Sequence, residues 1–311
     1  MRDGGILVTC VILTYNKFSE IEDTIQSVLN QTYPAIELII SDDASDNMPK
    51  AEIENYISIH RKENIKKYVV IQHTENVGTV KNANNAIRLA TGKYIFPLAG
   101  DDCFYSDSVI EKVVQTMEQR QWNHILCRRM TCTDFQTETG LRPSEREIRK
   151  IKKLNTAYKQ KMALISNKSY HLATGAGFFY SKDLFDKLGG YDEQYRLLED
   201  LPLFYKMVKE NIALNTCYDI IAILYQLGGV STTKCRSTAL DFDIATFYKA
   251  IWEQDNQDFP RKVKRLVYVV YMIKCEFPNM KLLKKIVFIL RYLDIFVEKA
   301  VCKVFGSHSA F

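Results

Sequence analysis

Short apolar runs alternate with helical patterns along the first hundred residues. The runs at 7–13, 38–40, 68–72 and 94–98 are rich in aliphatic and β-branched residues, as expected for buried strands. Between them, apolar residues recur at helical spacing. They are Ile21, Ile25, Val28 and Leu29 after an expected N-cap at Ser19, then the segment 50–61, then Val80, Ala83, Ile87 and Ala90. This order predicts an α/β fold with a doubly wound parallel sheet.

Polar residues cluster where each predicted strand ends. The clusters are 14–16, 42–46, 76–81 and 101–102. In such sheets, ligands bind outside the carboxyl ends of the strands, so four clusters at one edge predict a binding site. The glycine motifs of dinucleotide-binding and P-loop proteins, G-x-G-x-x-G and G-x-x-x-x-G-K-[ST], do not occur in the sequence.

Two adjacent carboxylates, Asp101 and Asp102, follow the strand at 94–98 after the small residues Ala99 and Gly100. At the end of a buried strand such a pair is unfavourable unless a cation or hydrogen-bond donors neutralise it. Hard oxygen ligands suit Mg²⁺ or Mn²⁺, which bind through one or two carboxylates and substrate phosphates. The alternative is a plain turn with solvated aspartates.

The second half of the chain contains another acidic pair. Glu199 and Asp200 precede a predicted helix that begins about residue 201 and has Pro202 in its first turn. One interpretation of Asp200 is a simple N-cap. A carboxylate among apolar neighbours can also receive a proton as a general base.

Five segments carry a family resemblance. They read VILTYNK, SVLNQTYPAIELIISDDASDN, NVGTVKNANNAI, ATGKYIFPLAGDD and GAGFFYSKDLFDKLGGYDEQYRLLEDLPLFYKM, within residues 5–235. In these segments the chain resembles the family-2 inverting glycosyltransferases of bacterial polysaccharide and oligosaccharide synthesis, which have the GT-A fold. The resemblance implies a GT-A domain at 1–235, with a nucleotide-sugar half at 1–104 and an acceptor half at 105–235. A helical region follows at 236–311.

The resemblance places the nucleotide on the first two loops. In the family, the loop Thr14, Tyr15 and Asn16 and the second aspartate after strand two, Asp43, hold the nucleoside base. A carboxylate that accepts from a base N–H and a tyrosine ring that stacks on it suit uracil. A loop cap is the alternative for Asp43.

The resemblance also implies roles for Lys81, Asp101 and Asp102. Lys81 lies where many relatives have a basic residue, although Asn-Ala-Asn at 82–84 replaces the common Ala-Arg-Asn, and a solvated lysine is the alternative. Asp101 would bind the ribose and Asp102 the metal. Ala99 replaces the first aspartate of the common Asp-x-Asp-Asp, so Mn²⁺ or Mg²⁺ would take its other ligands from diphosphate and water.

The implied reaction is the transfer of a sugar from a UDP-sugar to a hydroxyl of a saccharide acceptor, of the inverting hexosyltransferase type. Asp200 would deprotonate the acceptor hydroxyl, with Glu199 as its orienting neighbour. The alternative is a non-catalytic nucleotide-sugar-binding or scaffold protein, but a pure binder needs no base. A nucleotidyltransferase would need a Gly-rich triphosphate signature near residue 1, and none is present.

The 311 residues, 47% hydrophobic and 25% charged, have the composition of a globular protein, but their charge is unevenly distributed. Residues 261–311 carry 11 Lys and Arg against 3 Asp and Glu, a net charge of +8, whereas residues 1–260 carry 31 against 34, a net charge of −3. Over 281–305, apolar residues form a stripe along one side of a predicted helix, and the opposite side is rich in lysine. The stripe contains Leu283, Ile286, Ile289, Leu290, Leu293, Val297, Ala300, Val301 and Val304.

This pattern predicts a helix in a membrane interface and argues against nucleic acid as the partner. Bacterial relatives often extend lipid-linked oligosaccharides, so we expect a lipid-linked acceptor. The alternative is that the tail packs on the catalytic domain. Eight scattered cysteines without a C-x-x-C pair predict reduced thiols in the cytoplasm, and hence a peripheral protein on the cytoplasmic face of the membrane.

Overall fold

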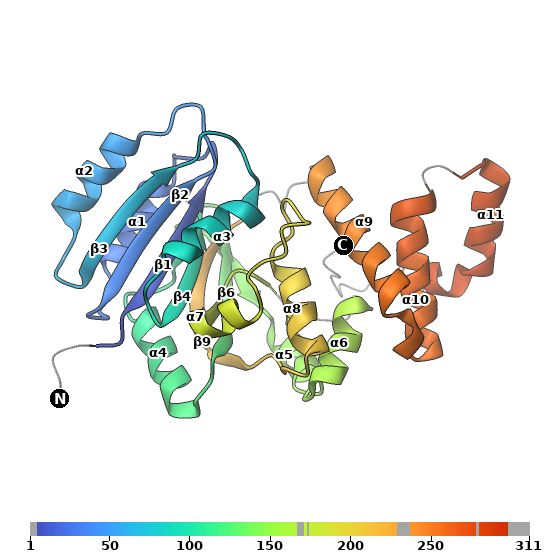
Figure 1. Cartoon of the computed structure of the whole chain (residues 1–311). Helices are drawn as coiled ribbons and strands as arrows, with labels where there is room; N and C mark the ends of the chain where they lie inside the picture. The colour runs from blue at the N-terminus through green and yellow to red at the C-terminus, as the bar shows by residue number, and fades with distance from the viewer. Residues whose placement is uncertain (1–4, 167–170, 173, 229–236, 278–279, 298–311) are drawn as a thin grey trace.

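A computed structural model describes residues 5–166, 171–172, 174–228, 237–277 and 280–297 of the chain. A twisted β-sheet lies between helices, and further helices extend from one side of it (Figure 1). The strands are β1 (Val8–Thr14), β2 (Ile36–Asp42), β3 (Ile65–Gln72), β4 (Tyr94–Ala99), β5 (Cys103–Phe104), β6 (His124–Cys132), β7 (Glu138–Arg142), β8 (Phe178–Ser181) and β9 (Thr216–Gln226). The predicted α/β class is confirmed.

The first four helices are α1 (Ile21–Leu29), α2 (Lys50–His60), α3 (Thr79–Leu89) and α4 (Val109–Arg120). Those of the second half are α5 (Glu145–Ile151), α6 (Ala157–Ile165), α7 (Lys182–Lys187), α8 (Asp200–Lys209) and α9 (Thr238–Gln254). The chain continues through a short 3₁₀ turn η1 (Asn256–Asp258), α10 (Arg261–Tyr271), the π-helical segment η2 (Met272–Glu276) and α11 (Leu282–Arg291).

The sheet is parallel at one end and mixed at the other. Its strand order is β3-β2-β1-β4-β8-β6-β9-β5, with β7 paired to β6. The strands β1 to β4 are parallel, as predicted. Beyond β4, where the sequence predicted no strand direction, the sheet is mixed, because β8 is antiparallel to both β4 and β6. One continuous sheet therefore joins the nucleotide-sugar half and the acceptor half that the sequence suggested.

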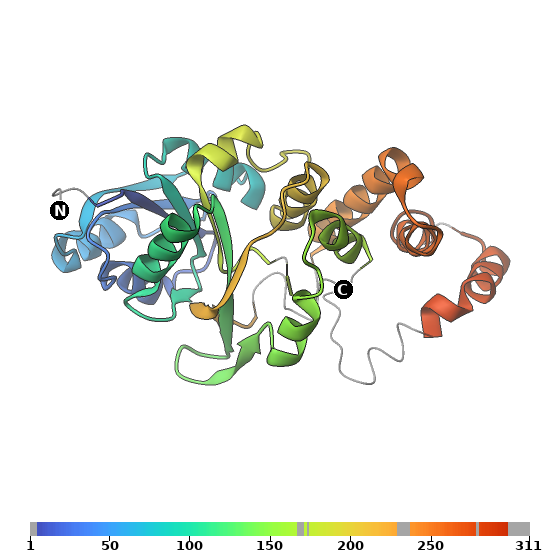
Figure 2. The ribbon, with the colours of Figure 1, turned by 90° about the horizontal axis from the view of Figure 1, so that it is seen from below.

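Helices cover both faces of the sheet (Figure 2). Val8, Cys10 and Ile12 of β1 pack in one core with α1, α2 and α4, whereas Val11 packs in the other core with α3. Alternate residues of one strand thus enter different cores, as in a sheet buried on both sides. This burial fixes the edge at which the polar loops emerge.

Helix boundaries differ from the prediction at the start of α1. Glu20, not Ser19, occupies the N-cap position, and it makes no side-chain cap hydrogen bond. The Ser19 hydroxyl instead donates to the Glu20 carboxylate. The predicted apolar face is confirmed, since Ile21, Ile25 and the last turn of α1 are buried.

The C-terminal helices fall into a packed part and an outer part. Val267 and Val270 of α10 join the core that also contains α9, so this basic and apolar segment packs as ordinary core. α11 lies at the outer edge of the molecule in both views (Figures 1 and 2). Phe288 packs against α10, while Leu283 and Leu290 are 73% and 65% exposed. The stripe residues Ala300, Val301 and Val304 lie outside the described residues. None of the helices described is long and apolar enough to span a bilayer.

Candidate active site

The polar loops after β1, β2 and β4 meet at one edge of the sheet. Gly100 donates its backbone N–H to the Leu13 carbonyl at 2.8 Å, and Asn16 donates its N–H to the Ser45 hydroxyl at 2.7 Å. A Cβ at Gly100 would lie only 3.1 Å from the Thr14 Cβ, so the small residue permits this approach. The convergence predicted from the strand ends is present.

Asp43 joins the loop after β2 to the start of α3. Its carboxylate is buried and accepts the backbone N–H groups of Val77 and Gly78, each at 2.8 Å. Burial raises its pKa, an effect that these two hydrogen bonds oppose. Asp43 therefore caps this loop, as the alternative interpretation expected. Its binding of the nucleoside base stays a prediction. Nearby Tyr15 is 49% exposed.

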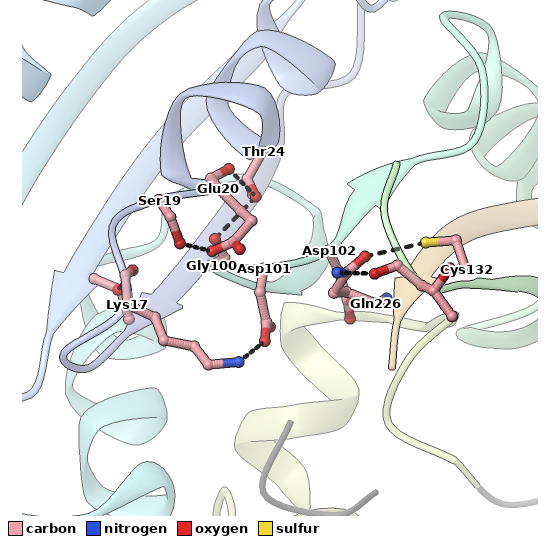
Figure 3. A network of polar contacts seen from close by, with 11 residues as sticks. Lys17, Ser19, Glu20, Thr24, Gly100, Asp101, Asp102, Cys132 and Gln226 are labelled. Atoms are coloured by element: carbon pink, nitrogen blue, oxygen red, sulfur yellow. Dashed lines mark hydrogen bonds and ion pairs between the residues drawn. The ribbon is translucent and has the colours of Figure 1, made fainter. Parts of the chain in front are cut away.

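The acidic pair after β4 turns toward two different partners (Figure 3). Asp101 forms an ion pair with the Lys17 ammonium at 2.7 Å. Asp102 is 4% exposed, and its Oδ1 accepts the backbone N–H of Gln226 at 2.9 Å. Burial raises the pKa of Asp102 to about 8, and the neighbouring Asp101 charge acts in the same direction. The plain-turn alternative does not describe a carboxylate as buried as Asp102.

The fit of a divalent ion to this loop depends on Asp102. No group of three or more His, Cys, Asp or Glu side chains in the described part of the chain could hold a metal. Asp102 Oδ2 accepts no hydrogen bond from a described residue, so one hard oxygen ligand is available. Such a donor set fits Mg²⁺ or Mn²⁺ only when diphosphate and water complete the coordination.

The second acidic pair lies at the start of α8. Asp200 Oδ2 accepts the Gly175 N–H at 3.0 Å, and Oδ1 accepts the Leu201 N–H at 2.6 Å. The helix begins at Asp200, with Glu199 in the N-cap position, so the N-cap interpretation of Asp200 is wrong by one residue. Burial raises the pKa of Asp200. Burial and the adjacent Asp200 charge also raise the pKa of Glu199.

Arg129 on β6 interacts electrostatically with one carboxylate of each acidic pair, and the sequence did not predict this role. Its Nη1 donates to the Thr174 hydroxyl at 2.5 Å, and its guanidinium lies 4.6 Å from the centre of the Tyr225 ring. Its positive charge acts on both Asp102 and Asp200. The signal was an arginine pair in the middle of the largely apolar strand at 124–132.

Two lysines differ from expectation. Lys17, within the segment that carried the resemblance, forms an ion pair with Asp101 that the sequence did not predict. Lys81 is exposed in the first turn of α3, where its charge acts on Glu193. Among the described residues, no hydrogen bond or ion pair joins Lys81 to Asp43, Asp101 or Asp102. Its predicted role, to face base or phosphate, stays a prediction.

Comparisons with known proteins agree with this geometry. The family model for "Glycosyl transferase family 2" matches residues 9–189. A glycosyltransferase of Bacillus subtilis (strain 168) whose name links it to teichuronic acid biosynthesis, TuaG, is 33% identical over 120 residues, which are 39% of this chain and 45% of that protein. An uncharacterized glycosyltransferase of Haemophilus influenzae is 24% identical over 209 residues, 66% of this chain and 63% of that protein. The chain thus spans less than two thirds of each of these relatives.

Solved structures of low sequence identity share the fold. S. aureus TarS 1–349 in complex with UDP-GlcNAc has a TM-score of 0.61 and 14% identity, over 90% of this chain and 77% of that chain. The mannosyltransferase PcManGT of Pyrobaculum calidifontis, in complex with GDP-Man and Mn²⁺, has a TM-score of 0.57 and 17% identity, over 97% of this chain and 76% of that chain.

Proposed function

Because this chain belongs to glycosyl transferase family 2 and has the GT-A fold, we propose that it is an inverting glycosyltransferase. It moves a sugar from a UDP-sugar to a hydroxyl of a saccharide acceptor. The observation that carries the proposal is that the charge of Arg129 acts on two carboxylates of raised pKa, Asp102 and Asp200, one from each acidic pair. UDP-GlcNAc in the structurally similar TarS complex supports a UDP-sugar as the donor.

Asp200 is the general base of the proposed reaction. A raised pKa lets its carboxylate accept the proton of the acceptor hydroxyl as that oxygen attacks the anomeric carbon. The bonds from Gly175 and Leu201 hold the carboxylate in place, and Glu199 is its orienting neighbour. A single displacement of UDP inverts the anomeric centre.

Asp102 would hold Mg²⁺ or Mn²⁺ in the proposed site. When bound, the ion would neutralise charge on the departing diphosphate. A mannosyltransferase of similar fold binds Mn²⁺ together with its nucleotide sugar, which supports a metal here. Thr14, Tyr15, Asn16 and Asp43 would bind the base, Lys81 would face base or phosphate, and Asp101 would bind the ribose.

The acceptor is proposed to be a lipid-linked saccharide in cell-surface polysaccharide synthesis. The name of the relative TuaG supports polysaccharide synthesis. The exposed leucines of α11 and the net charge of +8 over 261–311 support a peripheral location on the cytoplasmic face of an anionic membrane. The buried free thiols of Cys10, Cys103 and Cys127 are compatible with the reducing cytoplasm.

Release of UDP from a panel of UDP-sugars, with Mn²⁺ and with or without membrane lipid extract, tests the proposal. Asp200→Asn and Asp102→Ala should each lower the rate by about 100-fold or more. Asp186→Asn, on the exposed face of α7 and ion-paired with Lys182, is the control and should keep the wild-type rate. Binding of UDP without turnover under any acceptor condition would favour the scaffold alternative.

A further inference from the structure

Arg129 has donors that the protein leaves unused. A guanidinium carries five N–H donors, and a buried donor without a partner is unfavourable. Nη1 of Arg129 donates to Thr174, but the buried Nε has no hydrogen-bond partner. No ion pair joins Arg129 to a carboxylate in the described part of the chain. An acceptor from outside the chain would satisfy this side chain.

The guanidinium is held in place before any ligand arrives. It stacks on the Tyr225 ring and is bonded to Thr174. Its backbone lies within the sheet, opposite Arg142 of β7 and Ile223 of β9. A donor fixed in this way binds an incoming acceptor with little loss of side-chain entropy.

The surroundings of Arg129 place it at the reacting centre of the proposed site. Thr174 precedes Gly175, whose N–H binds the Asp200 carboxylate. Tyr225 precedes Gln226, whose N–H binds the Asp102 carboxylate. Arg129 thus contacts Thr174, next to the residue that binds Asp200. It also contacts Tyr225, next to the residue that binds Asp102.

We propose that Arg129 binds the β-phosphate of the donor's diphosphate through Nε–H and the adjacent Nη2 edge. The inference rests on the proposed function. A guanidinium fork matches two oxygens of a phosphate, and the low polarity of a buried site strengthens such a charged hydrogen bond. The β-phosphate is the group that must lie between the Asp102 end of the site and the sugar. A fixed cation there stabilises the charge of the departing UDP beside a single metal-binding carboxylate.

The adjacent Arg128 offers a matched control. It lies on the same strand and is buried, but its donors are used within the fold. Nε donates to the Pro143 carbonyl at 3.1 Å, and Nη1 pairs with Glu145 at 2.8 Å. The partners of Arg128, Pro143 and Glu145, are thus different from Thr174 and Tyr225, the partners of Arg129.

Calorimetric titration of the full chain with UDP, UMP and uridine, in excess Mg²⁺, tests the proposal. Arg129→Gln should weaken UDP binding by roughly ten- to a hundredfold. It should leave UMP and uridine binding within about twofold, because neither has a β-phosphate. Arg129→Lys keeps the charge without the fork and should lose less affinity. Arg128→Gln should bind UDP as wild type does, and the melting temperature of every variant is measured alongside.

Equal weakening of UDP, UMP and uridine binding by Arg129→Gln would show a structural role and overturn the proposal. Unchanged UDP affinity in both Arg129 variants would overturn it as well. Failure of wild type to bind UDP at all would instead contradict the proposed function.

Discussion

A carboxylate of the candidate site is buried far more deeply than an aspartate in a surface turn. Asp102 is the clearest case, because its folded-state pKa is about 8 and burial is the main cause. A carboxylate that is hard to ionise in the apoprotein is suited to a site in which a ligand brings positive charge. This burial has a measurable effect on stability.

In the metal-free protein, Asp102→Asn should remove part of the pH dependence of stability. The folded pKa of Asp102 is about 8 and an unfolded aspartate has a pKa of about 4, so the folded state binds more protons between these values. The free energy of unfolding of wild type, relative to the variant, should therefore fall as pH rises. The fall is at most about 1.4 kcal/mol per pH unit.

Urea unfolding at pH 5.5, 6.5 and 7.5 in EDTA measures this difference. Glu118→Gln is the control, because hydrogen bonds from Lys93 and Tyr94 lower the Glu118 pKa. Its folded and unfolded pKa values both lie below this pH range, so its difference from wild type should stay constant. A constant difference for Asp102→Asn as well would contradict the prediction.

A glycine is required at position 78 because its φ is positive and because no room exists for a side chain. It has φ +89°, and a Cβ there would lie 2.6 Å from the Arg196 carbonyl oxygen. Gly78→Ala should destabilise the protein by roughly 2–4 kcal/mol and weaken UDP binding, because the Asp43 contact to the Gly78 N–H would shift. Urea unfolding and UDP titration measure the two effects.

Gly189→Ala tests the effect of backbone strain alone, without a steric clash. Gly189 has φ +76° but nothing within 4 Å of a Cβ, so only backbone strain is added. We expect this variant to lose roughly 1 kcal/mol and to bind UDP normally. Equal losses in the two variants would show that the clash with Arg196 is unimportant.

At the scale of elements, α9 supports the loop that leads into α8. The buried Asp243 carboxylate of α9 accepts three successive backbone N–H groups through one oxygen, from Arg196, Leu197 and Leu198, at 2.9, 2.6 and 3.1 Å. The Arg196 carbonyl in turn accepts the Val80 N–H of α3. One loop thus links α9, α8 and the Asp43 end of α3.

Asp243→Ala should destabilise the protein by roughly 2–4 kcal/mol, since it leaves three backbone donors without their acceptor. It should also lower sugar transfer, because the loop precedes Glu199 and Asp200. Asp241→Ala, which removes an exposed pair with Lys274, should cost less than about 1 kcal/mol. Thermal unfolding and UDP release compare the two, and similar effects would argue against a support role for α9.

On the scale of the whole molecule, basic charge and exposed apolar side chains coincide at α11. Leu282, Leu283, Ile286, Val287 and Leu290 are exposed there beside Lys281, Lys284 and Lys285. α11 lies at the far side of the C-terminal helices from the sheet (Figure 1). A membrane that contacts α11 would therefore not cover the loops at the sheet edge.

The double variant Leu283→Glu and Leu290→Glu should bind anionic vesicles at least about tenfold more weakly than wild type in a flotation assay. The control is Ile59→Glu, which changes an apolar residue of α2 that is 65% exposed. It should float as wild type does. Wild-type protein that fails to float with anionic vesicles would remove the membrane proposal, and flotation insensitive to both variants would place the contact elsewhere.

The sequence by itself determined the class of the fold and the edge that carries the site. Apolar runs and helical spacing are local signals, and parallel strands bring their carboxyl ends together, so Thr14, Asp43 and Asp102 could be placed without coordinates. The observed bounds of β2 and β3 and the N-cap of α1 differ from the prediction, because they depend on contacts with neighbouring elements that no local pattern specifies.

Only the tertiary structure decided which distant groups act on one another. Arg129, Lys17 and Asp243 were not predicted, because each depends on a partner tens of residues away that no local pattern reveals. The antiparallel insertion of β8 between β4 and β6 brings the loop of Gly175 and Asp200 toward the loop of Asp102. Hydrophobic periodicity fixes which face of an element is buried, but the packing of those faces fixes the distances and the raised pKa values on which the proposed chemistry depends.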